Sequence, residues 1–186
     1  DFFRDKHELQ PLPPGLWKFL RMRPSNFPTI RLSQFCSFLY RTKANPYFLT
    51  EILDIRLWEE FLRVPVAPYW ETHFVFDVPA IHSARIMGDE SIQSLIINGF
   101  IPYIFANGGF DKTPGERKTA LGMLDSMPAE SNSLIKKWIA AGIRPQTALQ
   151  SQALIQLKNC YCDKKRCLQC SIGQNILTGV NDEGNG

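Results

Sequence analysis

Apolar residues recur at helical spacing along most of the chain, which predicts a protein built mainly of helices. The clearest case follows Pro28, where apolar side chains fall at i, i+3, i+4, i+7 and i+8: Leu32, Phe35, Cys36, Leu39 and Tyr40. Pro28 itself suits a first helical turn, because an amide in that turn has no partner to lose. The pattern therefore predicts an amphipathic helix with one apolar face.

Prolines and capping residues predict where the other helices begin and end. The run at 89–106 is apolar on all sides, which is typical of a buried central helix, and Gly99 and Pro102 predict a kink or break within it. Asp54 is placed to cap a helix, and Gly142 is placed to end one. The remaining expected helices cover residues 16–22, 45–53, 54–62, 114–126, 129–141 and 146–160.

These elements predict an all-α fold class, a compact multi-helix domain with one irregular or extended segment near 64–79. Proline at both ends of that segment argues against a central strand. Three parts are expected along the chain: an extended lead-in over 1–15, a single helical domain over 16–177 and a flexible tail over 178–186.

Composition agrees with a globular protein and leaves its function open. The chain has 186 residues, of which 44% are hydrophobic and 21% charged, and its net charge is +3. No apolar stretch approaches the length of a membrane span, so we expect a cytoplasmic protein with no membrane partner. The opening residues, DFFRDK, contain neither a start methionine nor a leader, so we expect a fragment or a processed product.

Four of the five cysteines fall within eleven residues: Cys160, Cys162, Cys167 and Cys170. Thiolates suit zinc or an iron–sulfur cluster, and a C-x-x-C step lets two sulfurs reach one metal. The spacing matches neither a zinc ribbon nor a ferredoxin. One alternative uses Cys162, Cys167 and Cys170 with a remote ligand such as Cys36 or a histidine, and another leaves all of them as reduced structural thiols.

Basic residues gather in two places, and both are candidate phosphate contacts. Lys164, Lys165 and Arg166 lie within the cysteine segment, while Lys18, Arg21, Arg23 and Arg31 belong to the first helical region. The neighbouring aromatic residues Trp17, Phe19 and Phe27 would suit base stacking. The alternative is a solvated basic surface over core aromatics, in which Arg23 and Asn26 form internal hydrogen bonds that hold a turn.

The sequence contains no recognised catalytic arrangement. It has no H-E-x-x-H, P-loop, G-x-S-x-G or dinucleotide motif. His73 beside Glu71, and His82, are the residues best suited to acid–base work. A lone histidine among aromatic residues is more often structural, so we assign no catalytic residue.

Two segments, WKFLRMRPSNFPTIRLSQF at 17–35 and YCDKKRCLQCSIG at 161–173, resemble a bacterial family classed as domain of unknown function 2851. INGFIPYIFA and AESNSLIKKWIAAGI are similar to it as well. The resemblance implies that this chain is the C-terminal half of a longer protein whose N-terminal half is a partner. It associates Cys162, Cys167 and Cys170 with the family, and Cys160 is an addition.

By analogy, the missing half resembles metal-dependent nuclease cores. The leading hypothesis is therefore a helical accessory domain of a bacterial nucleic-acid-processing protein, with or without a cysteine-bound metal. The alternative is a metal-free protein–protein interaction or structural helical module. Salt-dependent binding to nucleic acid separates the two hypotheses.

Overall fold

A computed structural model describes residues 2–11, 13–45, 47–107 and 114–178. Its regular structure is helical apart from one short two-stranded sheet, which confirms the all-α fold class. The chain divides into two compact units, residues 1–93 and 94–186. We call these unit 1 and unit 2 and describe each by itself.

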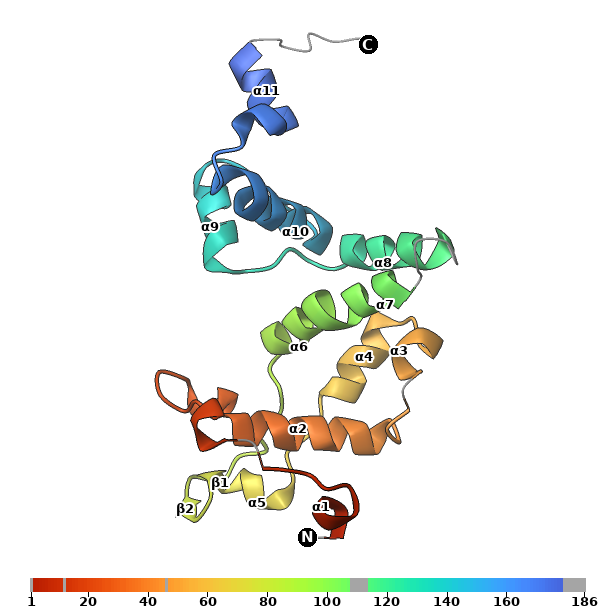
Figure 1. Cartoon of the computed structure of the whole chain (residues 1–186), viewed down its shortest axis with the longest axis vertical. Coiled ribbons are helices and arrows are strands. Elements are labelled where there is room, and N and C mark those ends of the chain that lie inside the picture. Colours follow the sequence, from red (N-terminus) through yellow and green to blue (C-terminus); the bar gives the residue numbers. More distant parts are fainter. Residues whose placement is uncertain (1, 12, 46, 108–113, 179–186) are drawn as a thin grey trace. The chain divides into compact units, whose positions relative to one another are not determined.

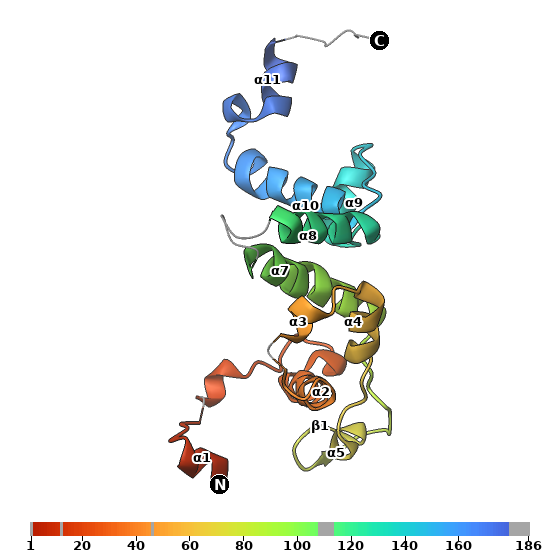
Figure 2. The ribbon, with the colours of Figure 1, turned by 90° about the vertical axis from the view of Figure 1, so that its right-hand side faces the viewer.

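Unit 1 is organised around one long helix, α2. Its elements are α1 (Phe2–Lys6), η1 (Pro14–Leu16), η2 (Pro24–Asn26), α2 (Pro28–Arg41), α3 (Phe48–Glu51), α4 (Ile55–Leu62), α5 (Pro68–Glu71), β1 (His73–Val75), β2 (Val78–Pro79) and the start of α6 (Asp89–Leu95). Helix α2 lies between α4 and the α5–β1 segment (Figures 1 and 2). The buried apolar side chains of unit 1 are Ile30, Phe48, Trp58, Leu62, Val64, Val66 and Ile92.

Local signals at helix starts are confirmed. Pro28 is the first residue of α2, and the Asp54 carboxylate accepts hydrogen bonds from the backbone N–H groups of Arg56 and Leu57 at the start of α4. The helix expected over 16–22 is wrong, because Arg21 adopts a left-handed backbone with φ 60° that a helix cannot continue through. The helix expected over 45–53 is shorter, covering Phe48–Glu51, and Pro46 lies outside the described residues.

Helix α2 forms as predicted, but its apolar face is not the buried one. Three of the five residues in the apolar pattern are exposed by 46%, 53% and 87%: Leu32, Phe35 and Tyr40. The buried residues are Ile30, Ser33 and Gln34. Ser33 and Gln34 hydrogen-bond to the backbone of segments that pack against α2, so this polar side of the helix faces the rest of unit 1.

The segment expected to be extended, 64–79, contains both a helical turn and a hairpin. Residues 64–67 have no regular secondary structure, with Ala67 extended, α5 follows, and β1 pairs antiparallel with β2 with His73 opposite Pro79. Asp77 makes the turn with φ 59°, and its N–H donates to the Tyr69 hydroxyl at 3.0 Å. The sheet has two strands, which agrees with the prediction that proline excludes a central strand.

Unit 2 contains the end of α6 and a group of packed helices. Its elements are η3 (Ile96–Phe100), α7 (Ile101–Asn107), α8 (Pro114–Ser126), α9 (Ser133–Ala140), α10 (Ala148–Leu157), η4 (Lys158–Cys162), η5 (Cys167–Gln169) and α11 (Ser171–Thr178). Helix α8 packs against α7 and α10, and α10 also packs against α9. The buried apolar side chains are Ile96, Ile97, Ile101, Ile104, Ala120, Met123, Met127, Ile135 and Ala148.

The interruption predicted near Gly99 and Pro102 is confirmed. A π-helical turn, η3, separates α6 from α7. It ends at Phe100, two residues before Pro102, which has no N–H group to continue the α-helical hydrogen bonds. The segment is buried on one side only, because Tyr103 and Phe105 are exposed. Gly142 has φ 91° just beyond α9, as expected of a residue that ends a helix.

None of the helices in the described ranges has the length and apolar content that crossing a membrane requires. Residues 179–186 of the expected flexible tail lie outside the described residues, and Thr178 ends α11.

Candidate functional site

Two of the predicted phosphate contacts, Arg23 and Arg31, line one pocket of about 960 Å³ in unit 1. We call it the polar pocket. Its walls come from η2, the first turns of α2 and the segment 80–91. Arg21 is exposed and does not line the pocket. The motif RPSNFPTIR therefore supplies one wall, because η2 turns the chain back so that both of its arginines face the same hollow.

Arg31 is held in the pocket by three neutral side chains. Its Nη1 donates to Gln34 Oε1 at 2.9 Å, and its Nη2 donates to Asn26 Oδ1 at 2.6 Å and to Ser91 Oγ at 3.1 Å. These partners belong to α2, η2 and α6, so the guanidinium connects three elements. Of its five N–H donors, these bonds use three, and the others remain available to a ligand.

No carboxylate of the described residues forms an ion pair with Arg31. Burial lowers the pKa of the Arg31 guanidinium from its ordinary value, because removal from water disfavours the charged form. An arginine remains protonated at neutral pH even so. The carboxylate of Glu90 lines the pocket and is exposed, without pairing to either arginine. The pocket therefore holds a half-buried positive charge with neutral partners only.

Gln34 and Arg85 form the back of the polar pocket. Gln34 is 2% exposed, and its Nε2 donates to the Arg85 backbone oxygen at 2.7 Å. The Arg85 guanidinium lies over the Phe74 ring at 4.0 Å and donates to the backbone oxygens of Trp70 and Ile81. The Arg85 guanidinium is therefore bound within unit 1. Of the described cations in the pocket lining, this leaves Arg23 and Arg31 to face the pocket.

The sequence left it open whether Arg23 and Asn26 of RPSNFPTIR form internal hydrogen bonds, and the structure contains one of them. Asn26 does form an internal hydrogen bond, as the acceptor for Arg31. The Arg23 side chain has no hydrogen bond or ion pair with the described residues, and it is exposed. Phe19 packs edge-on against Phe27, with ring centroids 5.1 Å apart, so these two rings contribute to packing.

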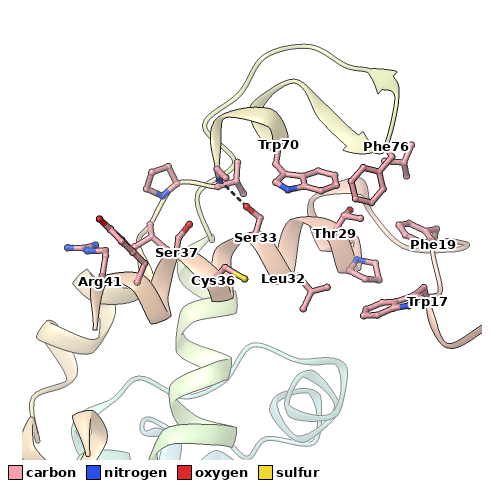
Figure 3. A pocket seen from close by; sticks show the side chains of 17 residues that line it. Trp17, Phe19, Thr29, Leu32, Ser33, Cys36, Ser37, Arg41, Trp70 and Phe76 are labelled. Carbon is pink, nitrogen blue, oxygen red and sulfur yellow. Dashed lines mark hydrogen bonds between the residues drawn. The ribbon is translucent and has the colours of Figure 1, made fainter. Parts of the chain in front are cut away.

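A second hollow, of about 980 Å³, lies along α2, is lined by none of the residues of the polar pocket and is almost wholly apolar. We call it the α2 groove. Leu32, Ser33, Cys36 and Ser37 form its floor, and Val64–Ala67 forms one wall. Figure 3 shows Arg41 toward one end of α2 and Trp17, Phe19 and Phe76 toward the other. The two hollows of unit 1 therefore share α2, one charged and one apolar.

The second group of basic residues lies in unit 2. Lys164, Lys165 and Arg166 form an exposed turn between η4 and η5, in which Lys165 has φ 52°. They form no ion pair with the described residues. This turn remains an accessible basic site, separate from the polar pocket of unit 1.

All five cysteines are free thiols. Cys160 and Cys162 lie in η4, Cys167 lies in η5 and Cys170 follows it, whereas Cys36 belongs to α2. Among the described residues, no three His, Cys, Asp or Glu side chains come close enough together to hold a metal ion. In this arrangement the thiols of the cysteine segment do not converge on a common point.

The histidines considered for acid–base work form local contacts. His82 Nε2 lies 3.0 Å from Glu71 Oε2, and the His82 side chain is 70% exposed. His73 stacks on Tyr69, with ring centroids 4.1 Å apart, and its Nδ1 lies 3.0 Å from the Tyr69 backbone oxygen. Packing on Tyr69 therefore accounts for the His73 ring, and His82 makes one exposed contact with Glu71.

A family model described as "Protein of unknown function (DUF2851)" matches residues 1–133. The chain belongs to this family. No curated protein and no solved structure matches the chain.

The DUF2851 match contains every residue that lines the polar pocket and the α2 groove. It ends before the cysteine segment at 160–170. The two hollows of unit 1 therefore belong to the part of the chain by which the family is recognised.

Sequence reasoning missed most of the polar pocket's lining, including the hydrogen-bonding residues Gln34, Arg85 and Ser91. Arg85 and Ser91 come from a segment about 50 to 60 positions beyond α2, and their type gives no signal of a pocket. The sequence did carry one signal for Gln34. It lies three residues after Arg31 and four after Ile30, and residues at these spacings share one face of a helix.

Proposed function

We propose that this chain is a helical accessory domain of a bacterial nucleic-acid-processing protein, and that the polar pocket of unit 1 binds a phosphate of the nucleic acid. The observation that carries the proposal is the half-buried Arg31 guanidinium, held by neutral side chains only. A charge removed from water without a counter-charge raises the free energy of the folded protein. A bound phosphate supplies that counter-charge.

The chemistry of the pocket suits a phosphate. Arg31 is fixed in direction by three hydrogen bonds, so little side-chain entropy is lost when its remaining N–H groups bind an anion. Arg23 supplies a second guanidinium, and Ser25 supplies a hydroxyl at the same wall. Planar guanidinium groups bind phosphate oxygens through paired hydrogen bonds. Phosphate contacts of this kind position a nucleic acid without reading its sequence.

The test is the affinity of a fluorescein-labelled single-stranded oligonucleotide of about 16 nucleotides, measured across a salt series. We expect Arg23→Gln and Arg31→Gln each to weaken binding and to reduce the slope of log K against log salt by about 0.7. Arg56→Gln is the matched control, because Arg56 is an exposed arginine on α4 outside the pocket. Glu90→Gln removes the acidic side chain found among the described residues of the pocket lining and should strengthen binding.

Circular dichroism and thermal unfolding establish that each variant is folded before binding is compared. Arg31→Lys keeps the charge but not the paired donors, so it should retain part of the affinity. The proposal is rejected if no oligonucleotide, single-stranded or duplex, DNA or RNA, binds at about 50 mM salt. It is also rejected if Arg56→Gln weakens binding as much as Arg31→Gln does, since the binding would then be diffuse.

A metal held by the thiols of Cys160, Cys162, Cys167 and Cys170 is a separate part of the proposal, and sequence spacing alone supports it. Zinc or an iron–sulfur cluster would cross-link this end of the chain and stabilise it without taking part in chemistry. Because the thiols do not converge in this structure, metal uptake requires the segment 160–170 to close around the ion. The proposal further places the protein in the cytoplasm, with the exposed turn at 164–166 as a second phosphate contact.

One observation favours the alternative, a metal-free protein–protein interaction module. The α2 groove exposes apolar side chains that soluble proteins normally cover. Nucleic-acid binding at the polar pocket and protein binding at the groove would use different residues of α2, so separate variants test them. A domain that binds no oligonucleotide but binds a protein through the groove would fit the alternative.

A further inference from the structure

The α2 groove combines an exposed apolar face with a defined shape. Leu32 and Tyr40 are 46% and 87% exposed, and both line the groove. The floor between them carries the small side chains of Ser33, Cys36 and Ser37, while Trp70 and Phe76 rise beside it (Figure 3). Small residues between large ones form a channel into which the side chains of another helix can pack.

We infer that the α2 groove binds an amphipathic helix of a partner protein, whose apolar face enters the groove and whose flanking residues are acidic. The inference is independent of phosphate binding at the polar pocket, because the two sites have no lining residue in common. Aromatic residues at the groove's rim are of the type that dominates binding energy in protein interfaces.

The groove wall favours a helix over an extended peptide. A peptide strand gains affinity by pairing with free backbone groups at an exposed edge. In the wall at Val64–Ala67, Pro65 has no N–H group, and the Ala67 N–H already donates to Ser33 Oγ at 2.9 Å. Pro68 follows directly and also lacks an N–H group. A helix satisfies its own backbone hydrogen bonds, so it needs only the apolar contacts that this groove offers.

The length of the groove fits about three helical turns. Its lining along α2 runs from Pro28 to Arg41, and a helix advances about 1.5 Å per residue, which gives roughly 18 to 20 Å. A partner helix of about 12 residues covers that distance. Apolar side chains at i, i+3, i+4 and i+7 of such a helix would face the floor around Cys36.

The charge around the groove defines the flanks of the partner. The described residues that line the groove include no Asp or Glu, Arg41 lies at one end of it, and the exposed Lys18 lies between the lining residues Trp17 and Phe19 at the other. Arg41 lines the groove itself, and its position is fixed because Nη1 donates to the Glu60 backbone oxygen at 3.0 Å and the guanidinium lies over Phe61. Opposite charges on the partner would steer it to this face and exclude basic competitors.

The experiment uses two synthetic amphipathic peptides of about 12 residues, matched in their leucine positions. One carries glutamate at the remaining positions and the other carries lysine. Binding of each peptide to the full chain is followed by fluorescence anisotropy, and NMR chemical-shift changes identify the contacted residues. Leu32→Glu introduces a repelling charge at the groove, and Leu57→Glu is the control, because Leu57 is similarly exposed on α4 outside the groove.

We expect the glutamate peptide to bind with saturation and to shift the resonances of Leu32, Cys36 and Trp17. Leu32→Glu should weaken this binding about tenfold or more, and Leu57→Glu should leave it within about twofold. The lysine peptide should bind about tenfold more weakly than the glutamate peptide. Because Leu32 is exposed, its replacement leaves the fold intact, which circular dichroism verifies.

Three outcomes overturn the inference. Equal binding of the two peptides, or none, excludes an acidic helix. Shifts at the groove caused by the oligonucleotide instead of the peptide assign it to base stacking. Concentration-dependent self-association that Leu32→Glu abolishes assigns it to a second copy of the chain. Failure here is distinguishable from failure of the phosphate site, because Arg31→Gln should leave peptide binding unchanged and Leu32→Glu should leave oligonucleotide binding unchanged.

Discussion

The buried amide of Gln34 holds the Arg31 guanidinium, with 2.9 Å between Gln34 Oε1 and Arg31 Nη1. The same amide donates through Nε2 to the Arg85 backbone oxygen at 2.7 Å. Gln34 therefore fixes the direction of a candidate phosphate contact and at the same time anchors the segment that forms the pocket's far wall. The placing of Arg31 in the polar pocket and the stability of the pocket wall therefore both depend on the Gln34 side chain, which would not itself bind the ligand.

Replacing Gln34 with leucine should destabilise the protein. The leucine fills a similar volume but leaves the Arg85 carbonyl and one Arg31 donor without their partner, which costs about 1 to 3 kcal/mol for each buried group left unsatisfied. Urea unfolding followed by circular dichroism measures the change. Gln156→Leu on the exposed face of α10 is the control, and it should change stability by less than about 0.5 kcal/mol. An unchanged midpoint for Gln34→Leu would mean that the amide contributes nothing to the pocket.

Local sequence signals predicted the elements of this fold better than their burial. Asp54 and Gly142 act within a few residues of their position, so the start of α4 and the end of α9 could be placed from sequence. The periodicity of α2 gave a helix with two distinct faces, but burial depends on which segments pack against each face. Ser33 and Gln34 find backbone partners far along the chain, which periodicity does not encode.

The candidate site was predictable to a similar extent. Arg23 and Arg31 were among the predicted phosphate contacts, because clustered basic residues are a recognisable pattern, but the cluster also included Lys18 and Arg21, which do not line the pocket. The wall opposite them, with Arg85 and Ser91, comes from a segment whose residues resemble any polar loop. The cysteine spacing indicated metal chemistry, but spacing gives the distance along the chain and leaves the distance between sulfurs undetermined.

Two glycines should respond to alanine in opposite directions. Gly142 has φ 91°, where an added Cβ strains the backbone although no atom lies within 4 Å of it, so Gly142→Ala should destabilise by about 1 kcal/mol. Gly122 lies within α8, also with nothing within 4 Å, so Gly122→Ala should stabilise by about 0.5 to 1 kcal/mol. Thermal unfolding of both variants measures the shifts. Shifts of the same sign would contradict the assignment of Gly142 to a left-handed position.

Removing the cap of α4 should cost about 1 kcal/mol. The Asp54 carboxylate accepts from the Arg56 N–H at 2.8 Å, and alanine leaves this first-turn donor to water. Asp54→Asn keeps a side-chain oxygen and should retain most of the stability, which separates capping from a general charge effect. Urea unfolding measures all three proteins. Equal losses for alanine and asparagine would show that the hydrogen bond to the helix start is not the stabilising contact.

Zinc should change the reactivity of the cysteine segment if the thiols close around a metal. Without metal, we expect an alkylating reagent to modify the exposed thiols of Cys36, Cys162 and Cys167 before the half-buried Cys160 and Cys170, as peptide mass spectrometry reports. With stoichiometric zinc, Cys162, Cys167 and Cys170 should be protected together, because a bound thiolate is no longer a free nucleophile. Cys36 on α2 is the internal control and should react at the same rate throughout. Equal labelling of the segment with and without zinc, together with a metal content below about a tenth of an equivalent in oxygen-protected protein, would leave these cysteines as structural thiols and remove the metal from the proposal.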